Sequence, residues 1–316
     1  MSTRIIFLDR ASLPVRFAPP RCAASYAEYP ETGAEQVLER LAGAAVAITN
    51  KVPLGAAVLA RLPDLRLVAI AATGYDCVDV GYCRANGIVV SNIRQYAIHT
   101  VPEHVFALLL ALRRNLIGYR ALVAAGGWQR ARQFCAFDGE IRDLHGSVLG
   151  IVGRGSIGSA VAAIGAAFGM QVLFATGPGL RNADAEQRPL AELLRAADVV
   201  TLHCPLTAAT HGLIGEKELR SMKRGAILIN TARGGLVDEQ ALRRALTEGW
   251  IGGAGFDVLT SEPPHDGNAL LDIDLPNFIL TPHVAWASIE AMEGLADQLT
   301  GNIEAWANGA PRNVVA

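Results

Sequence analysis

The chain has 316 residues, of which 51% are hydrophobic and 18% charged, with 28 Lys and Arg against 30 Asp and Glu. That length is sufficient for two domains, each with a core of its own. The near-neutral charge lacks the basic excess of nucleic-acid-binding proteins, so we expect no nucleic-acid partner.

The apolar segments and the cysteines bear on where the protein works. The N-terminal MSTRIIFLDR has too few consecutive apolar residues for the core of a signal peptide. The longest apolar run, residues 105–112, is too short to span a membrane. The five cysteines are odd in number and form no CxxC pair, which indicates free thiols. We therefore expect a cytoplasmic protein with no membrane partner and no metal site.

The first hundred residues alternate short apolar runs with helical patterns. Continuous apolar runs are typical of strands in a parallel sheet that is covered on both faces. We expect strands at residues 5–8, 44–49, 67–71 and 88–90, with helices such as 35–41 and 56–62 between them.

A long apolar helix is expected to begin at Pro102 and to run toward Trp128. Proline suits the first turn of a helix, because the amide hydrogen that it lacks would have no partner there. One face of this helix carries Val105, Leu108, Leu109, Leu112 and Leu116. We interpret it as the spine that enters a second domain.

Strands and helices alternate again after Gly146, and the number of strands is that of a doubly wound nucleotide-binding sheet. A final helix, about 288–308, could return to the first domain. We therefore predict a discontinuous domain of residues 1–98 and 286–316 and a dinucleotide-binding domain of residues 99–285. The six expected strands are residues 148–152, 172–175, 199–203, 226–230, 253–257 and 278–281.

The sequence VGRGSIG follows the first strand of this second domain and opens a helix. Gly153 suits the tight turn, Gly155 a close approach to a pyrophosphate, and Gly158 close packing of helix on strand. The amides and the dipole at the start of the helix attract phosphate. A dinucleotide site is predicted, the alternative being a turn that needs glycines for shape alone.

The next strand does not end in the usual acidic residue, which would accept hydrogen bonds from the adenosine ribose and repel a 2′-phosphate. Thr176 stands there instead, while Arg154 and Arg181 lie in the neighbouring loops. Either guanidinium could pair with a phosphate through two parallel hydrogen bonds. We expect NADPH to be preferred or used beside NADH; in the alternative, both arginines are solvated and NADH binds through other contacts.

Three ionisable residues follow successive strands of the predicted sheet, at the edge where such sheets bind ligands: Arg233, Glu262 and His283. Arg233 can hold a carboxylate and polarise a carbonyl. His283 can donate a proton, and an adjacent Glu262 favours its protonated form. Singly, each is more often a surface or structural residue, but together they predict hydride transfer to a 2-keto acid.

At this point the chain resembles the D-isomer-specific 2-hydroxyacid dehydrogenase family over nearly its whole length. The resemblance is carried by VGRGSIG, LHCPLTAATHGLIG, MKRGAILINTARGGLVDEQAL, FDVLTSEPP and TPHVAWAS. It implies a two-lobed α/β protein, in which a Rossmann-type doubly wound parallel sheet is joined to a smaller flavodoxin-like substrate lobe around a cleft. It also implies a homodimer formed through the nucleotide domain.

The resemblance further implies roles for individual residues. The catalytic trio is Arg233, Glu262 and His283, and the sequence ATGYD would bind the substrate carboxylate through Thr73 and Gly74. Trp286 could form a wall of the substrate pocket or simply pack in a core or interface. Asp257 would hold the nicotinamide carboxamide. The other implied cofactor contacts are Thr100, Gly153, Arg154, Gly155, Ser156, Ile157, Gly158, Thr176, Arg181, His203, Cys204, Pro205, Thr210, Thr231, Ala232, Arg233, His283 and Ala285.

Within the family, the chain is most similar to the glyoxylate/hydroxypyruvate reductase and glycerate dehydrogenase branch. We expect NAD(P)H-dependent reduction of a small 2-keto acid to the D-2-hydroxy acid. One alternative is oxidation of phosphite or formate on the same fold, although Glu262 argues against formate. Another is a non-catalytic NAD(H)-sensing protein like the corepressors that share this fold.

Overall fold

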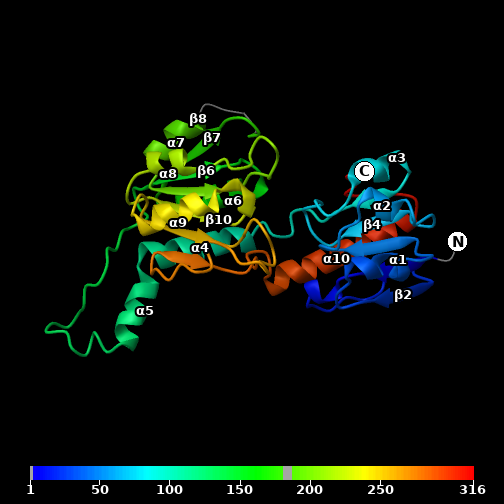
Figure 1. Cartoon of the computed structure of the whole chain (residues 1–316), viewed down its shortest axis with the longest axis horizontal. Helices are drawn as coiled ribbons and strands as arrows, with labels where there is room; N and C mark the ends of the chain where they lie inside the picture. Colours follow the sequence, from blue (N-terminus) through cyan, green and yellow to red (C-terminus); the bar gives the residue numbers. More distant parts are fainter. Residues whose placement is uncertain (1–2, 181–186) are drawn as a thin grey trace. The chain divides into compact units, whose positions relative to one another are not determined.

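The computed structural model describes residues 3–180 and 187–316 of the chain. They form two compact units, unit 1 (Met1–Tyr96 and Ala287–Ala316) and unit 2 (Ala97–Trp286) (Figure 1). The expected domain boundaries, after residues 98 and 285, differ from these by one or two residues. Within the described residues, none of the helices combines the length and apolar character that crossing a membrane requires.

Unit 1 is built on a parallel sheet with strand order β2-β1-β3-β4-β5, the order of flavodoxin-like folds. The four predicted apolar runs form β1, β3, β4 and β5. The edge strand β2 was missed because its sequence, SYAE, is not an apolar run. The strands are β1 (Arg4–Phe7), β2 (Ser25–Glu28), β3 (Val46–Thr49), β4 (Leu67–Ile70) and β5 (Val89–Ser91). The helices are η1 (Arg10–Ser12), η2 (Ala34–Gln36), α1 (Val37–Arg40), α2 (Ala56–Leu59), α3 (Val80–Ala85) and α10 (Ile289–Ala307).

The last helix, α10, returns to unit 1 and packs against β4 (Figure 1). The Ser288 side chain accepts a hydrogen bond from the Ala291 amide and so caps its start. Leu295 and Leu299 are fully buried along its inner face. The helix therefore closes the core of unit 1 with the C-terminal part of the chain.

Unit 2 contains a larger parallel sheet with strand order β12-β11-β10-β9-β6-β7-β8. Numbered from β6, this is the 3-2-1-4-5-6 order of the Rossmann fold with one further strand, so the predicted fold class is confirmed. The short edge strand β8, sequence QRP, was not predicted because it lacks an apolar run. The strands are β6 (Val148–Val152), β7 (Gln171–Thr176), β8 (Gln187–Pro189), β9 (Val199–Leu202), β10 (Ile227–Asn230), β11 (Gly253–Phe256) and β12 (Phe278–Leu280).

The long helix expected from Pro102 to Trp128 is two helices, and that prediction was wrong. Asn115 lies between them in the left-handed conformation, with φ of 50°, which interrupts the helical hydrogen bonds. Pro102 is the third residue of the first helix. The helices of unit 2 are α4 (Thr100–Arg113), α5 (Leu116–Ala124), α6 (Ser156–Ala167), α7 (Leu190–Ala196), α8 (Glu216–Ser221), α9 (Glu239–Thr247) and the short η3 (Gly234–Leu236).

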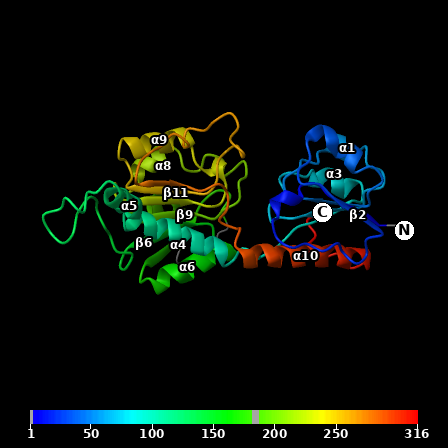
Figure 2. The same cartoon turned by 90° about the horizontal axis from the view of Figure 1, so that it is seen from below.

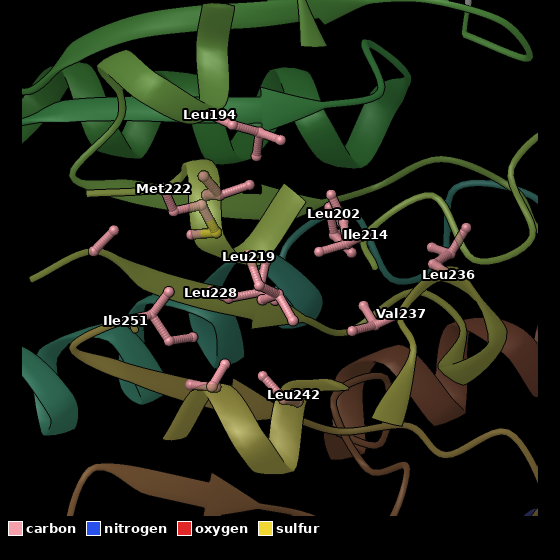
Figure 3. Close-up of a cluster of buried hydrophobic side chains, with 14 of the residues drawn as sticks. Leu194, Leu202, Ile214, Leu219, Met222, Leu228, Leu236, Val237, Leu242 and Ile251 are labelled. Carbon is pink, nitrogen blue, oxygen red and sulfur yellow. The ribbon is translucent and has the colours of Figure 1, made fainter. Parts of the chain in front are cut away.

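Two apolar clusters, one on each face, hold this sheet in place. Helices α4 and α6 cover one face with residues such as Val105, Leu109 and Val161 (Figure 2). On the other face, Figure 3 shows side chains of α7, α8 and α9 gathered against the strands, among them Leu194 and Leu242. Burial on both faces fixes the strands, and with them the loops that leave their carboxyl ends.

Candidate functional site

Strand register aligns the loops that carry the predicted site residues. Val152, Leu202, Asn230, Phe256 and Leu280 are successive partners across β6, β9, β10, β11 and β12. The next residues of each strand therefore leave the sheet at one common edge. The β6–β9 boundary is also where the strand order reverses, which is where open α/β sheets bind ligands.

The glycine loop after β6 is shaped by contact with the end of β9. Gly153 has φ of 112°, and a Cβ atom there would lie 2.5 Å from the His203 carbonyl oxygen. Only glycine can therefore occupy this position without displacing β9. Gly158, buried in α6, packs its α-carbon on the carbonyl of Gly153, where a Cβ would lie 2.0 Å from that oxygen.

The start of α6 has the properties of an anion-binding site. Gly155 caps the helix without a side-chain hydrogen bond, and the first turn, which begins with Ser156 and Ile157, has no acidic residue. A Cβ atom on Gly155 would meet nothing within 4 Å, so the space beside this residue is open. A dinucleotide pyrophosphate fits these residues.

Thr176, at the end of β7, occupies the position that an acidic residue usually holds. The Arg154 guanidinium lies 4.8 Å from the ring centroid of Phe174 in the same strand, a cation–π contact. Arg154 thus extends from the glycine loop over β7. Arg181 lies outside the described residues.

The loop after β9 offers uncharged groups. Burial lowers the pKa of His203 to about 4, and its Nε2 lies 2.9 Å from Thr201 Oγ1. Burial likewise raises the pKa of Cys204 to about 11, so imidazole and thiol are both neutral at pH 7. Pro205, the next residue, is exposed.

Thr210, an expected cofactor contact, lies in the turn that follows β9. Its side chain is fully buried, and its hydroxyl donates to the Pro205 carbonyl at 2.6 Å and accepts from the Thr207 amide at 2.8 Å. Through these hydrogen bonds Thr210 shapes the turn that follows β9.

Asn230, at the end of β10, holds the turn that presents Arg233. This fully buried side chain donates to the Arg233 carbonyl at 2.9 Å and accepts from the Ala232 amide at 3.1 Å. In the same turn Thr231 Oγ1 is buried without a hydrogen-bond partner in the described residues, an unsatisfied polar atom that a bound ligand could pair.

The turn after β10 also contacts the loop after β11. A Cβ atom on Gly234 would lie 2.0 Å from the backbone carbon of Leu259, so the close approach of the two loops requires glycine. Arg233 and the Glu262 loop are thereby held at neighbouring positions along the sheet edge.

The side chains of Glu262 and His283 are in hydrogen-bond contact. The distance between Glu262 Oε2 and His283 Nδ1 is 2.5 Å, and Glu262 Oε1 accepts from the Leu259 amide at 2.7 Å. Both side chains are about one-third exposed, at 31% and 28%. Because Nδ1 faces the carboxylate, Nε2 is the ring nitrogen left to exchange a proton with a substrate.

Glu239, which the sequence analysis did not single out, anchors the loop that carries Glu262. Its two carboxylate oxygens accept from the Thr260 amide and from Asn268 Nδ2, both at 2.7 Å. An acidic residue at the first position of a helix such as α9 is common and indicates no particular function. The signal in the sequence that could have drawn attention to Glu239 was its place in the LVDEQAL motif.

The backbone of His283 is in the left-handed conformation, with φ of 55°, which is uncommon for a residue other than glycine. Its amide donates to the Asp257 carbonyl at 2.8 Å, and its own carbonyl accepts from Trp286 Nε1 at 3.0 Å. The Asp257 carboxylate accepts from the amides of Val284, at 2.9 Å, and Ala285, at 2.8 Å. Asp257 is 1% exposed, so contact with a carboxamide would require this loop to move.

Two further groups of predicted residues can be located. Thr100, at the start of α4, donates through Oγ1 to the Ala285 carbonyl at 3.0 Å, so α4 joins the His283 loop. Thr73 and Gly74 lie in unit 1 beyond the end of β4, where Thr73 Oγ1 donates to the Ile93 carbonyl at 2.8 Å.

Comparison with known proteins gives consistent matches. Residues 106–285 match the model of the D-isomer specific 2-hydroxyacid dehydrogenase NAD-binding domain. The chain is 52% identical to a glycerate dehydrogenase of Methylorubrum extorquens, over 100% of this chain and 99% of that one. It is 37% identical to a hydroxypyruvate reductase of Blautia hydrogenotrophica, over 90% and 88%. A solved acyclic imino acid reductase in complex with NADPH and D-Arg is similar with a TM-score of 0.86 and 31% identity, over 99% and 100%.

Proposed function

The chain belongs to the D-isomer specific 2-hydroxyacid dehydrogenase family and is an NAD(P)-dependent dehydrogenase, and on that premise we propose that it reduces hydroxypyruvate or glyoxylate to the D-2-hydroxy acid. The observation that carries the proposal is the hydrogen-bond contact between Glu262 and His283, at the end of the sheet where ligands bind. Relatives named glycerate dehydrogenase and hydroxypyruvate reductase support the substrate class.

The cofactor, when bound, supplies the hydride. Its pyrophosphate would lie on the amides at the start of α6, next to the open space beside Gly155. Its nicotinamide end would pair with the unsatisfied Thr231 Oγ1. The residues that would hold it are Thr100, Gly153, Arg154, Gly155, Ser156, Ile157, Gly158, Thr176, Arg181, His203, Cys204, Pro205, Thr231, Ala232 and Ala285.

Arg233 would bind the substrate carboxylate through its two-pronged guanidinium and polarise the neighbouring carbonyl. His283 would then donate the Nε2 proton to the carbonyl oxygen as negative charge develops there. Glu262 favours the protonated ring that this step requires, and the Leu259 amide holds its carboxylate in line with Nδ1. In the oxidative direction, neutral His283 would accept the proton of the alcohol.

Specificity for a small substituent at the keto acid would come from Trp286. The hydrogen bond from its indole to the His283 carbonyl fixes the ring beside the catalytic histidine. A fixed indole can serve as a wall that admits hydrogen or hydroxymethyl and rejects larger groups. Thr73 and Gly74 are proposed to bind the substrate carboxylate through their amides.

We propose that NADPH is preferred to NADH. The proposal is supported by Thr176 in place of an acid and by the Arg154 side chain over β7, since a guanidinium pairs well with phosphate. Arg154→Ala and Arg181→Ala should each raise KM for NADPH more than KM for NADH. Equal changes for both cofactors would contradict the assignment of that arginine.

A panel of keto acids assayed with NADPH and NADH tests the function. We expect hydroxypyruvate or glyoxylate to be reduced at several turnovers per second or more, on the order of typical enzymes. Phosphite and formate, added with the oxidised cofactors, test the alternative chemistry. Tight cofactor binding without turnover of any compound would favour a sensor and contradict the proposal.

We propose that the partner is a second copy of this chain, bound through an arm consisting of α5 and residues 125–147, which carries exposed aromatic side chains. Figures 1 and 2 both show the arm projecting from unit 2. Phe134 is 90% exposed and Phe137 84%, and Trp128 Nε1 donates to the Phe134 carbonyl, which orders the loop. Together with Trp128, these rings in two copies offer roughly half of a standard 1,600 Å² interface.

Sedimentation velocity tests the dimer. Phe134→Asp with Phe137→Asp should yield a monomer at concentrations where the wild type is dimeric. Ile289→Asp, which changes an exposed apolar residue of unit 1, is the matched control and should stay dimeric. A monomeric wild type would contradict the proposal.

We also propose a reducing, cytoplasmic location. All five cysteines are free, and burial raises the pKa of Cys77, Cys83 and Cys204 to about 11, which keeps these thiols protonated and unreactive. Thiol titration of the unfolded protein from cells, without reductant, should find five thiols per chain.

A further inference from the structure

His104 of α4 has contacts that the proposed mechanism does not use. Its side chain is 21% exposed, and its Nε2 lies 3.0 Å from Thr281 Oγ1 and 3.7 Å from Asp257 Oδ1. Thr281 in turn lies 2.5 Å from Asp257 Oδ1. A helix on one face of the sheet is thus connected by side chains to the ends of β11 and β12.

The chemistry of the three groups fixes the direction of these hydrogen bonds. The Thr281 hydroxyl has a single proton, which it donates to Asp257 Oδ1. Thr281 Oγ1 can then only accept from His104, which must carry a proton on Nε2. The order of donation is therefore His104 to Thr281 to Asp257.

Asp257 is the acceptor at the end of this chain and also holds the loop of His283. Its carboxylate accepts the amides of Val284 and Ala285, and its carbonyl accepts the amide of His283. Such contacts offset the strain of the left-handed backbone at His283. A carboxylate that rotated away would release the Val284 and Ala285 amides.

We propose that His104 is a positioning residue for His283, acting through Thr281 and Asp257. This inference rests on the proposed function, because it assigns His104 the task of keeping the proton donor aligned with its substrate. His104 fixes the Thr281 hydroxyl, the hydroxyl fixes one rotamer of the Asp257 carboxylate, and the carboxylate holds the two backbone amides that follow the catalytic histidine.

The test compares His104→Leu, which keeps apolar volume but removes the donor, with His104→Gln, which retains an amide donor. His145→Leu is the control, since exposed His145 precedes β6 at the opposite edge of the sheet. We expect His104→Leu to lower kcat roughly tenfold, because small misalignments of catalytic groups have large effects on rate. KM for keto acid and for NADPH should stay within about twofold, and His104→Gln should recover most of kcat.

Two readouts do not depend on turnover. Hydrogen exchange of the Val284 and Ala285 amides should be roughly tenfold faster in His104→Leu than in wild type or the control, as expected for a loosened local structure. In the wild type, nitrogen NMR of the imidazoles should show His104 protonated at Nε2, a measurement that requires no variant to fold.

The outcomes separate the two proposals. A wild type that reduces no keto acid contradicts the proposed function, while the exchange rates and the tautomer still decide the role of His104. Unchanged exchange and unchanged kcat in His104→Leu, or a wild-type His104 protonated only at Nδ1, would overturn the positioning role.

Discussion

Replacement of Glu262 by Gln changes the charge behind the proton donor with almost no change in shape. In the wild type, one carboxylate oxygen accepts from the Leu259 amide and the other pairs with His283 Nδ1. The single oxygen of Gln can satisfy only one of them. If it keeps the Leu259 amide, its NH₂ group faces Nδ1, and the doubly protonated ring has no acceptor there.

The size of the effect follows from the lost hydrogen bond. A hydrogen bond to a charged group contributes about 1.5–3 kcal/mol. Because the two side chains are about two-thirds buried, water screens this hydrogen bond only in part, and most of its energy is retained. At 1.36 kcal/mol per factor of ten, kcat for keto-acid reduction should fall by roughly tenfold to 150-fold. KM for NADPH should hardly change, because Glu262 is assigned no cofactor contact.

The assay follows the loss of reduced cofactor absorbance at saturating hydroxypyruvate and NADPH. Glu218→Gln is the matched control, since Glu218 also accepts one backbone amide, that of Gly215, and no histidine. It should retain wild-type kcat. A Glu262→Gln enzyme with kcat within about twofold of wild type would refute the argument that this carboxylate supports proton donation.

Three further predictions concern other parts of the site. Gly153→Ala should lower the free energy of unfolding by about 1–3 kcal/mol and weaken NADPH binding, because its Cβ would lie 2.5 Å from the His203 carbonyl oxygen. Calorimetry measures both the unfolding and the binding of NADPH, and no change in either would contradict this prediction. The pKa of His203 is lowered from 6.5 to about 4 by burial, so between these pH values the unfolded state binds a proton that the folded state does not. Unfolding free energy should therefore fall by up to roughly 3 kcal/mol as the pH drops through that window, and a urea series with His203→Gln that shows the same fall would contradict this. Arg233→Lys should raise KM for the keto acid about tenfold or more and KM for NADPH by much less, since lysine lacks the two-pronged geometry; equal effects on both would argue against carboxylate binding.

The parts of the fold predicted from sequence are those with strong local signals. The apolar run 148–152 is β6, and Ser288 caps α10 as the start of the last helix. Parallel strands release their loops at one edge, so strand order alone anticipated that Glu262 and His283 could meet. The structure places them in contact.

What sequence could not provide depends on single backbone angles and distant contacts. The break at Asn115 follows from one left-handed residue inside an apolar pattern that is otherwise helical. Strands β2 and β8 are too polar to stand out. Glu239 and His104 were missed because their partners, Asn268 and Thr281, lie far along the chain and only the fold brings them close.

The proton-donating role of His283 is tested most directly by single-turnover reduction of hydroxypyruvate with enzyme-bound NADPH, in the wild type and in His283→Ala. A positioned general acid contributes on the order of a hundredfold or more, so the variant should be slower by at least about that factor at neutral pH while binding NADPH as tightly as the wild type. Equal rates for the two proteins would contradict the account.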